Sequence, residues 1–264
     1  MALLETRFDS QILDLSLGLN VILPEHPQAW NTPPAVLYLL HGLSDDHTIW
    51  SRRTSIERYA ADYNLAVVMP DAYKSFYCDM THGSNYWAFL SEELPMLIHR
   101  WFKLSADPQQ TFVAGMSMGG YGAMKLALGN PGKYAAAASI FGALDIAAHI
   151  HDEWDSSRLR TFEAVFGDIA AVPGSGHDLM ARLAALDDIP ATRFFVCVGT
   201  NDYLYQDSVA FRDMAAEKGL NLTYREYAVD HEWGFADLRI QEVLEWLPIE
   251  KLPEEKIPGV RGEA

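Results

Sequence analysis

The sequence predicts a mainly parallel, doubly wound α/β sheet, and two observations support this fold class. Five short segments are apolar at almost every position, as expected of parallel strands that are covered on both faces: 35–41, 65–70, 111–116, 134–142 and 193–199. Segments with helical spacing alternate with them, at 49–63, 86–102, 118–128, 204–218 and 235–247. This alternation implies right-handed crossovers, so functional side chains are expected just beyond the carboxyl ends of the strands.

The remaining segments complete a prediction of one domain over residues 1–264, a length that can bury a substantial core. Residues 11–23 are apolar at odd positions and partly polar at even ones, which predicts an antiparallel strand with one wetter face. The irregular stretch 145–188 is expected to be a small cap insertion that covers the site. Residues 248–264 are polar and punctuated by proline, and we expect a C-terminal tail without a chemical role.

Composition excludes several kinds of partner. The chain has 36 acidic and 20 basic residues, and its formal charge of -16 repels nucleic acid and anionic membrane surfaces. The N-terminal residues lack the pattern of a secretory signal, and no stretch of about 18 residues is apolar, so we expect a cytoplasmic protein. Cys78 and Cys197 are the two cysteines, and Cys197 lies in an apolar run, which favours buried thiols over a disulfide.

The strongest motif is a G-x-S-x-G pattern centred on Ser117, with Gly115 and Gly119 on either side. It lies between the predicted strand 111–116 and the predicted helix 118–128. A sharp turn from strand to helix holds the serine in a strained conformation with its hydroxyl in the cleft, and the glycines allow neighbouring backbone to approach. The pattern therefore predicts that Ser117 is a nucleophile.

A serine hydroxyl is a weak nucleophile and needs a base, which in turn needs an orienting acid. In this arrangement the acid and then the histidine follow the serine along the chain. His231 is the histidine late in the chain, and Asp202 follows the predicted strand 193–199, with Asp207 nearby. Asp202 is the better placed acid, although it could instead cap a helix, and Asp145 is an alternative from the preceding strand.

The tetrahedral intermediate of acyl transfer needs backbone amides that bind its oxyanion. The residue after the nucleophile, Met118, supplies one such amide, and Leu43 in the loop after the strand 35–41 supplies the other. We expect His41, which ends that strand, to have a structural role in hydrogen bonding this loop.

No metal or other cofactor is expected. His149, His151 and Asp152 form an H-x-H-D cluster, but positions two apart do not share a helix face, and no second pair completes a metal site.

Three aromatic residues are candidates for substrate binding. Trp50, Tyr86 and Trp87 fall in or near loops that follow predicted strands, so they are expected either to line the pocket or to pack in the core.

Four segments of the sequence resemble one family: LYLLHGLSDDHTIW, LAVVMPDAYKSFYCDM, NYWAFLSEELP and GMSMGGYGAMKLAL. They are similar to the tributyrin esterases, within the esterase D and S-formylglutathione hydrolase group of the α/β-hydrolase superfamily, and the resemblance spans residues 37–246. It implies an α/β-hydrolase fold, catalysis without a cofactor and frequent assembly into homo-oligomers. It also implies a set of roles: Ser117 as nucleophile, Asp202 and His231 as its partners, and Leu43 and Met118 as oxyanion donors.

The expected function is a serine carboxylesterase that hydrolyses short-chain acyl esters through an acyl-enzyme intermediate. Two alternatives within the enzyme class are an S-formylglutathione hydrolase-like thioesterase and an acetyl esterase acting on carbohydrate esters. The thioesterase alternative is weakened because the loop HGLSDD lacks the cysteine of the LSGLTC-like loop in S-formylglutathione hydrolases. The alternative from another class is a catalytically silent ligand-binding module on the same fold.

Overall fold

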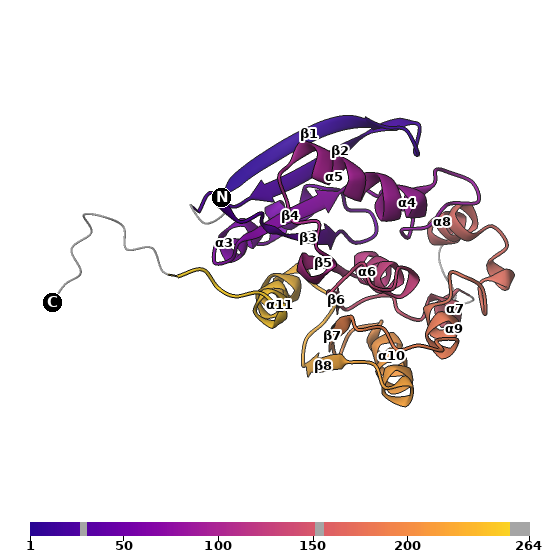
Figure 1. Cartoon of the computed structure of the whole chain (residues 1–264). Coiled ribbons are helices and arrows are strands. Elements are labelled where there is room, and N and C mark those ends of the chain that lie inside the picture. The colour runs from indigo at the N-terminus through magenta and orange to yellow at the C-terminus, as the bar shows by residue number, and fades with distance from the viewer. Residues whose placement is uncertain (27–30, 151–155, 254–264) are drawn as a thin grey trace.

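The computed structural model describes residues 1–26, 31–150 and 156–253. In these residues eight strands form one sheet in the order β1-β2-β4-β3-β5-β6-β7-β8 (Figure 1). The strands from β3 to β8 are parallel, whereas β2 is antiparallel to both β1 and β4. The predicted mainly parallel α/β fold is thus confirmed. The strands have these bounds: β1 Ala2–Ser10, β2 Leu15–Leu23, β3 Ala35–Leu40, β4 Leu65–Pro70, β5 Thr111–Met116, β6 Ala136–Ile140, β7 Arg193–Gly199 and β8 Leu222–Tyr227.

The start of the chain differs from the prediction. Residues 2–10 form β1, which was not predicted, and the strand expected over 11–23 begins only at Leu15. The expectation of a wetter face on this strand is wrong, because Asn20 and Ile22 at even positions are fully buried. The even face is covered by tertiary packing: a Cβ atom on Gly18 would lie within 2.5 Å of the His47 ring.

Helices cover both faces of the sheet (Figure 1). Two apolar clusters fill the spaces between the sheet and the helices. The predicted helix 49–63 is divided at Thr54, whose hydroxyl donates to the carbonyl of Trp50 and accepts from the amide of Ile56. The helices of one face are α5 Leu94–Trp101, α6 Met118–Gly129 and α10 Tyr205–Lys218; those of the other are α2 Ile49–Arg53, α3 Ile56–Ala60 and α11 Trp233–Trp246.

The predicted helix 86–102 consists of three consecutive pieces. α4 (Tyr86–Ala88) leads into a π-helical turn (Phe89–Glu93), which is followed by α5. The buried carboxylate of Glu93 in this turn accepts hydrogen bonds from the Ser10 hydroxyl and from the amide of Gln11. The π-helical turn thus places the Glu93 carboxylate where it accepts hydrogen bonds from the β1–β2 hairpin.

The described residues of the stretch 145–188 form three α-helices: α7 Ile146–His149, α8 Ser156–Phe166 and α9 Leu179–Ala184. Phe162 of α8 packs edge-on against Phe76 of the loop after β4, with ring centroids 5.6 Å apart. This contact joins the inserted segment to the main sheet. Short 3₁₀ turns occur at 108–110 and 169–171.

The start of the predicted tail is attached to the domain, because the amide of Leu252 donates to the carbonyl of Asp62. Residues 254–264 lie outside the described part of the chain. Among the described residues, no helix has the length and apolar character required to cross a membrane.

Candidate active site

Ser117 lies at a strained turn between β5 and α6. Its φ of 53° and ψ of -120° place a non-glycine residue at positive φ, a conformation that tertiary contacts must hold. The Ser117 amide donates to the carbonyl of Ile140 at 3.1 Å, and its carbonyl accepts from the amide of Ala143 at 3.2 Å. A Cβ atom on Gly119 would lie 2.4 Å from the carbonyl oxygen of Leu40, so only glycine allows α6 to start this close to β3.

The two amides predicted to bind an oxyanion lie beside Ser117. Met118 is the first residue of α6, where a backbone amide has no partner within the helix. Leu43 lines the same hollow as Ser117 and Met118, and a Cβ atom on the adjacent Gly42 would lie only 3.6 Å from Cβ of Ser117. Within the described part of the chain, neither amide donates to a protein acceptor. Both remain available to an oxyanion.

His231 and Asp202 form a directly hydrogen-bonded pair at the ends of β8 and β7. Nδ1 of His231 lies 2.8 Å from Oδ2 of Asp202, whose side chain is completely buried, whereas that of His231 is 19% exposed. The other carboxylate oxygen accepts from the amide of Leu204 at 2.8 Å. Because a carboxylate accepts, Nδ1 carries the proton and Nε2 is left as a proton acceptor. Asp202 thus orients the imidazole and also caps the following turn.

Two aromatic rings flank His231, and neither was predicted to be a site residue. Its ring centroid lies 4.2 Å from that of Phe141 and 4.8 Å from that of Tyr203. Burial raises the pKa of the Tyr203 phenol, which also interacts with the hydroxyl of Ser117. Tyr203 could have been suspected from its position directly after Asp202, but nothing in the sequence connects Phe141 with His231.

Ser117 lies at the junction of two hollows. The narrow hollow encloses about 20 Å³ and the wide hollow about 260 Å³. Four residues line both of them: Leu43, Ser117, Arg158 and Tyr203. The narrow hollow is otherwise mainly apolar, lined by Phe76, Met118, Ala143, Ile146, His149, Phe162 and Leu204. The wide hollow is otherwise more polar, lined by Gly42, Asp45, Met116, His231, Glu232 and Trp233.

Comparisons with known proteins agree with this geometry. The family model described as a putative esterase matches residues 10–235. The chain belongs to this esterase family. The acetyl esterase of Caldicellulosiruptor saccharolyticus is 26% identical over 261 residues, which cover 94% of this chain and 98% of the relative.

Two solved structures from Staphylococcus aureus are each 32% identical to this esterase. One is a substrate-bound, fluorophosphonate-binding serine hydrolase with a TM-score of 0.86, and the other is an S-formylglutathione hydrolase apoenzyme with a TM-score of 0.83. In both comparisons the alignment covers 93% of this chain and 98% of the other. Together with the family model, these similarities identify the chain as a carboxylic ester hydrolase.

The three aromatic residues that were candidates for substrate binding line neither hollow of the esterase. Trp50 is 1% exposed and donates from its ring to the carbonyl of Leu40; its ring packs edge-on behind Trp233, which does line the wide hollow. Tyr86 is buried in the core. Trp87 lies beneath the ammonium of Lys125. Rings from distant parts of the sequence line the hollows instead: Phe162 of α8 lines the narrow hollow, and Trp233 of α11 lines the wide one.

His41 has the structural contacts that were expected. Its Nε2 accepts from the amide of Ala72 at 2.9 Å, and Nδ1 lies 2.8 Å from the carbonyl oxygen of Gly42. Burial lowers the pKa of this imidazole. His41 therefore joins the loop that carries Leu43 to the loop after β4.

The esterase contains a second pair of aspartate and histidine. Nε2 of His149 contacts Oδ1 of the buried Asp207, whose Oδ2 accepts from the amide of Asp145 at 3.0 Å. Asp145 caps α7, accepting from the amide of Ala148, and burial raises the pKa of its carboxyl. Neither carboxylate contacts His231.

The candidate metal cluster is only partly visible, because His151 and Asp152 lie outside the described residues. Within the described ranges, no group of three side chains of the metal-binding types comes together.

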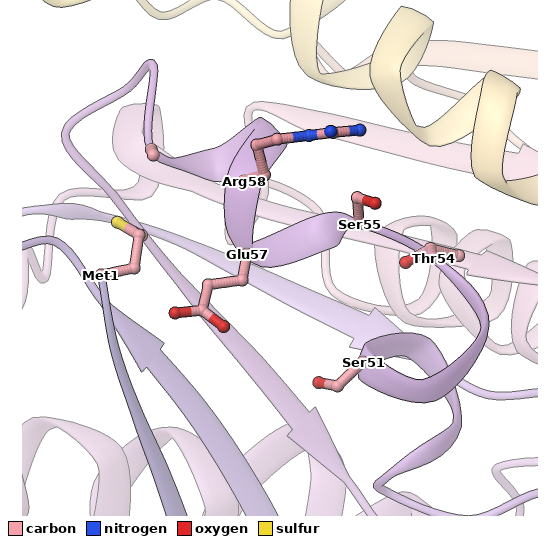
Figure 2. Close-up of a pocket in the computed structure, with 7 residues that line it drawn as sticks. Met1, Ser51, Thr54, Ser55, Glu57 and Arg58 are labelled. Carbon is pink, nitrogen blue, oxygen red and sulfur yellow. The ribbon is translucent and has the colours of Figure 1, made fainter.

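A further hollow of about 380 Å³ lies away from Ser117, between Met1 and the short helices α2 and α3. Figure 2 shows Glu57 directed into the gap between Met1 and Ser51, and Arg58 directed away from it. The residues that line this hollow include serines but no histidine that could activate a serine hydroxyl. This hollow therefore lacks the chemistry of the site at Ser117.

Proposed function

We propose that the chain hydrolyses short-chain acyl esters, with Ser117 as nucleophile, His231 as general base and Asp202 as the orienting acid. The observation that carries this proposal is the convergence of a strained serine, two free amides and a carboxylate-held imidazole on one pair of hollows. These are the parts that two-step acyl transfer requires.

In the first step, Nε2 of His231 takes the proton of Ser117 while the serine oxygen attacks the ester carbonyl. The carbonyl oxygen becomes an oxyanion held by the amides of Leu43 and Met118. Collapse of the intermediate breaks the bond to the alcohol, which His231 protonates as it leaves. His231 then activates a water molecule against the acyl-enzyme, and Asp202 stabilises the imidazolium in both steps.

The lining of the hollows supports an orientation for the substrate. His231 lines the wide hollow and not the narrow one, and a general acid must lie beside the leaving group that it protonates. The alcohol therefore occupies the wide hollow, and the acyl group enters the narrow one. About 20 Å³ is enough for roughly one water molecule, which restricts the acyl group to a short one. Longer acyl chains would have to displace Phe162 or Phe76.

The wide hollow favours an uncharged alcohol. Asp45 and Glu232 border it, burial raises the pKa of Asp45, and the whole chain has a formal charge of -16. Acetyl esters of neutral alcohols fit this environment, and the curated relative is an acetyl esterase. The second candidate is hydrolysis of S-formylglutathione, supported by the 32% identity to an S-formylglutathione hydrolase. Two carboxyl groups, Asp45 and Glu232, outnumber the single cation Arg158 in this lining, which weakens the second candidate because glutathione is itself an anion.

A series of nitrophenyl esters from acetate to palmitate tests the proposal. We expect kcat/KM to be highest for acyl chains of about two to four carbons and to fall beyond about eight, because further methylenes meet rings instead of free space. An optimum at about ten carbons or more would contradict the short-acyl proposal. S-formylglutathione is assayed in parallel, and a higher kcat/KM for it than for every ester would favour the second candidate.

A further inference from the structure

The chain contains a buried lysine in direct contact with a buried cysteine. Nζ of Lys125, in the middle of α6, lies 2.6 Å from Sγ of Cys78. Lys125 is 4% exposed and Cys78 is completely buried. This separation is shorter than the usual nitrogen–oxygen hydrogen bond of about 2.9 Å, although sulfur is the larger atom. Nζ of Lys125 and Sγ of Cys78 are therefore in direct contact.

The surroundings of Lys125 make Cys78 its principal polar partner. Its ammonium lies 5.4 Å from the ring centroid of Trp87 and 5.5 Å from that of Tyr121. Among the described residues it forms no ion pair with a carboxylate. Sγ of Cys78 also lies 3.0 Å from the carbonyl oxygen of Phe76, so the sulfur is held between the amine of Lys125 and the backbone of its own loop. The thiolate is the form of cysteine that reacts with peroxides.

Cys197 provides a matched comparison within the same chain. It is also a fully buried free thiol, and burial raises its pKa well above the usual range. In the described part of the chain no lysine contacts its sulfur. Two cysteines of equal burial thus differ in whether an amine is in reach.

We propose that Cys78 and Lys125 form an oxidation site, at which a hydroperoxide converts their contact into a covalent sulfur–nitrogen bond. The inference is independent of the proposed esterase mechanism, since neither side chain has a part in it. Phe76, two residues before Cys78, lines the narrow hollow, and α6 begins directly after Ser117. The bond would therefore tie a wall of the hollow to the helix behind the nucleophile.

The chemistry balances with hydrogen peroxide as the oxidant. The thiolate of Cys78 attacks one peroxide oxygen, a sulfur–oxygen bond forms, the oxygen–oxygen bond breaks, and sulfur loses two electrons. The departing hydroxide takes a proton from the Lys125 ammonium and leaves as water. The neutral amine then attacks the sulfenic sulfur, and a second water leaves as the sulfur–nitrogen bond forms. One thiolate, one ammonium and one peroxide thus give one sulfenamide and two waters.

Because Cys78 is completely buried, the reaction requires local opening of the loop after β4. Phe76 and Tyr77, directly before Cys78, have positive φ angles of 48° and 53°. Backbone strain of this kind persists only while the surrounding contacts hold it.

The test is peptide mass spectrometry on the full chain after treatment with hydrogen peroxide in the folded state. The protein is then unfolded in iodoacetamide, digested and mapped. We expect a linked pair of peptides containing Cys78 and Lys125, lighter than their sum by two hydrogen atoms and separated again by dithiothreitol. During the peroxide treatment, the fraction of Cys78 that still reacts with iodoacetamide should fall at least about tenfold faster than the same fraction of Cys197.

Equal loss at the two cysteines, or oxidation of Cys78 to a sulfinic acid without a link, would overturn the proposal. The Lys125→Arg variant adds a control, because arginine keeps the positive charge but is a poor nucleophile, and no link should form. A linked peptide containing Cys78 in that variant would also overturn the proposal, because its partner could not be Lys125. The comparison with Cys197 in the unmodified chain stands even if the variant does not fold.

Discussion

Two pairs of aspartate and histidine border the hollows at Ser117, and they differ in which ring nitrogen the carboxylate holds. Asp202 holds Nδ1 of His231, which leaves Nε2 as a proton acceptor. Asp207 instead contacts Nε2 of His149 and also accepts from a backbone amide. The first pair presents a base, whereas the second fastens α7 to the start of α10.

The two pairs share the same residue types, and the ring nitrogen that is left free separates the pair proposed to be catalytic from the other one. Asp202 and Asp207 are five positions apart and both are buried. His231 belongs to the wide hollow, beside the expected leaving group, and His149 belongs to the wall of the narrow hollow.

The largest effect is expected from Ser117→Ala, which removes the proposed nucleophile. Turnover of nitrophenyl acetate should fall by about a millionfold, because only binding and electrostatic stabilisation remain. Circular dichroism should be unchanged, and Ser139→Ala, at a buried serine of β6, is a control for removal of a hydroxyl. Turnover within about tenfold of the unmodified enzyme would reject Ser117 as nucleophile.

The contrast between the two pairs is tested by Asp202→Asn and Asp207→Asn. Asp202→Asn should lower kcat about ten-thousandfold, because an amide can hold the wrong imidazole tautomer. Asp207→Asn should lower kcat/KM less than about tenfold and mainly reduce the melting temperature, because it weakens the contacts to His149 and the amide of Asp145. Steady-state kinetics and thermal unfolding of both variants measure these effects.

Asp145→Asn serves as a third variant in the same experiment. Asp145 caps α7, so its replacement should cost about 1 kcal/mol of stability and leave kcat nearly unchanged. A larger loss of kcat in this variant than in Asp202→Asn would transfer the role of the acid to the end of β6.

A smaller effect concerns the choice of acyl chain. Phe162→Ala should shift the chain-length optimum of kcat/KM to longer esters, because this ring lines the narrow hollow. Trp87→Ala should not shift it, since Trp87 packs against Lys125 away from both hollows. The same ester series measures both variants. If the chain-length optimum shifted in Trp87→Ala and not in Phe162→Ala, Trp87 would be the residue that lines the acyl pocket.

Much of the fold could be predicted because parallel strands that are covered on both faces are short continuous apolar runs. The edge strand β1 was missed although Glu5 and Arg7 face solvent at alternate positions, because the apolar Leu3 lies on the outer face and the polar Thr6 on the inner one, which blurs the pattern. Chain order was enough to select Ser117, Asp202 and His231 as candidates. The walls could not be predicted in this way: Trp50 is buried by Trp233, which lies far away in the sequence, and Phe162 comes from an irregular segment.

The smallest effect is a pH dependence of stability. Burial lowers the pKa of His177 to about 4, from 6.5. Between these values the unfolded chain binds a proton that the folded chain does not, so the free energy of unfolding falls as the pH falls. His177→Gln should flatten the slope between pH 6.5 and 4, whereas His82→Gln, at an exposed histidine, should leave it unchanged. Urea unfolding across this range measures the slopes. Equal slopes for the two variants would contradict the assignment.

The most direct measurement of the central claim is the site at which a fluorophosphonate probe becomes attached. Such a probe reacts with a serine that a neighbouring base has activated. The enzyme is labelled, digested and mapped by mass spectrometry, with Asp202→Asn and Asp207→Asn treated in parallel. We predict a single adduct on Ser117, formed far more slowly in Asp202→Asn and at a nearly normal rate in Asp207→Asn. An adduct on another serine, or no adduct at all, would contradict the proposed site.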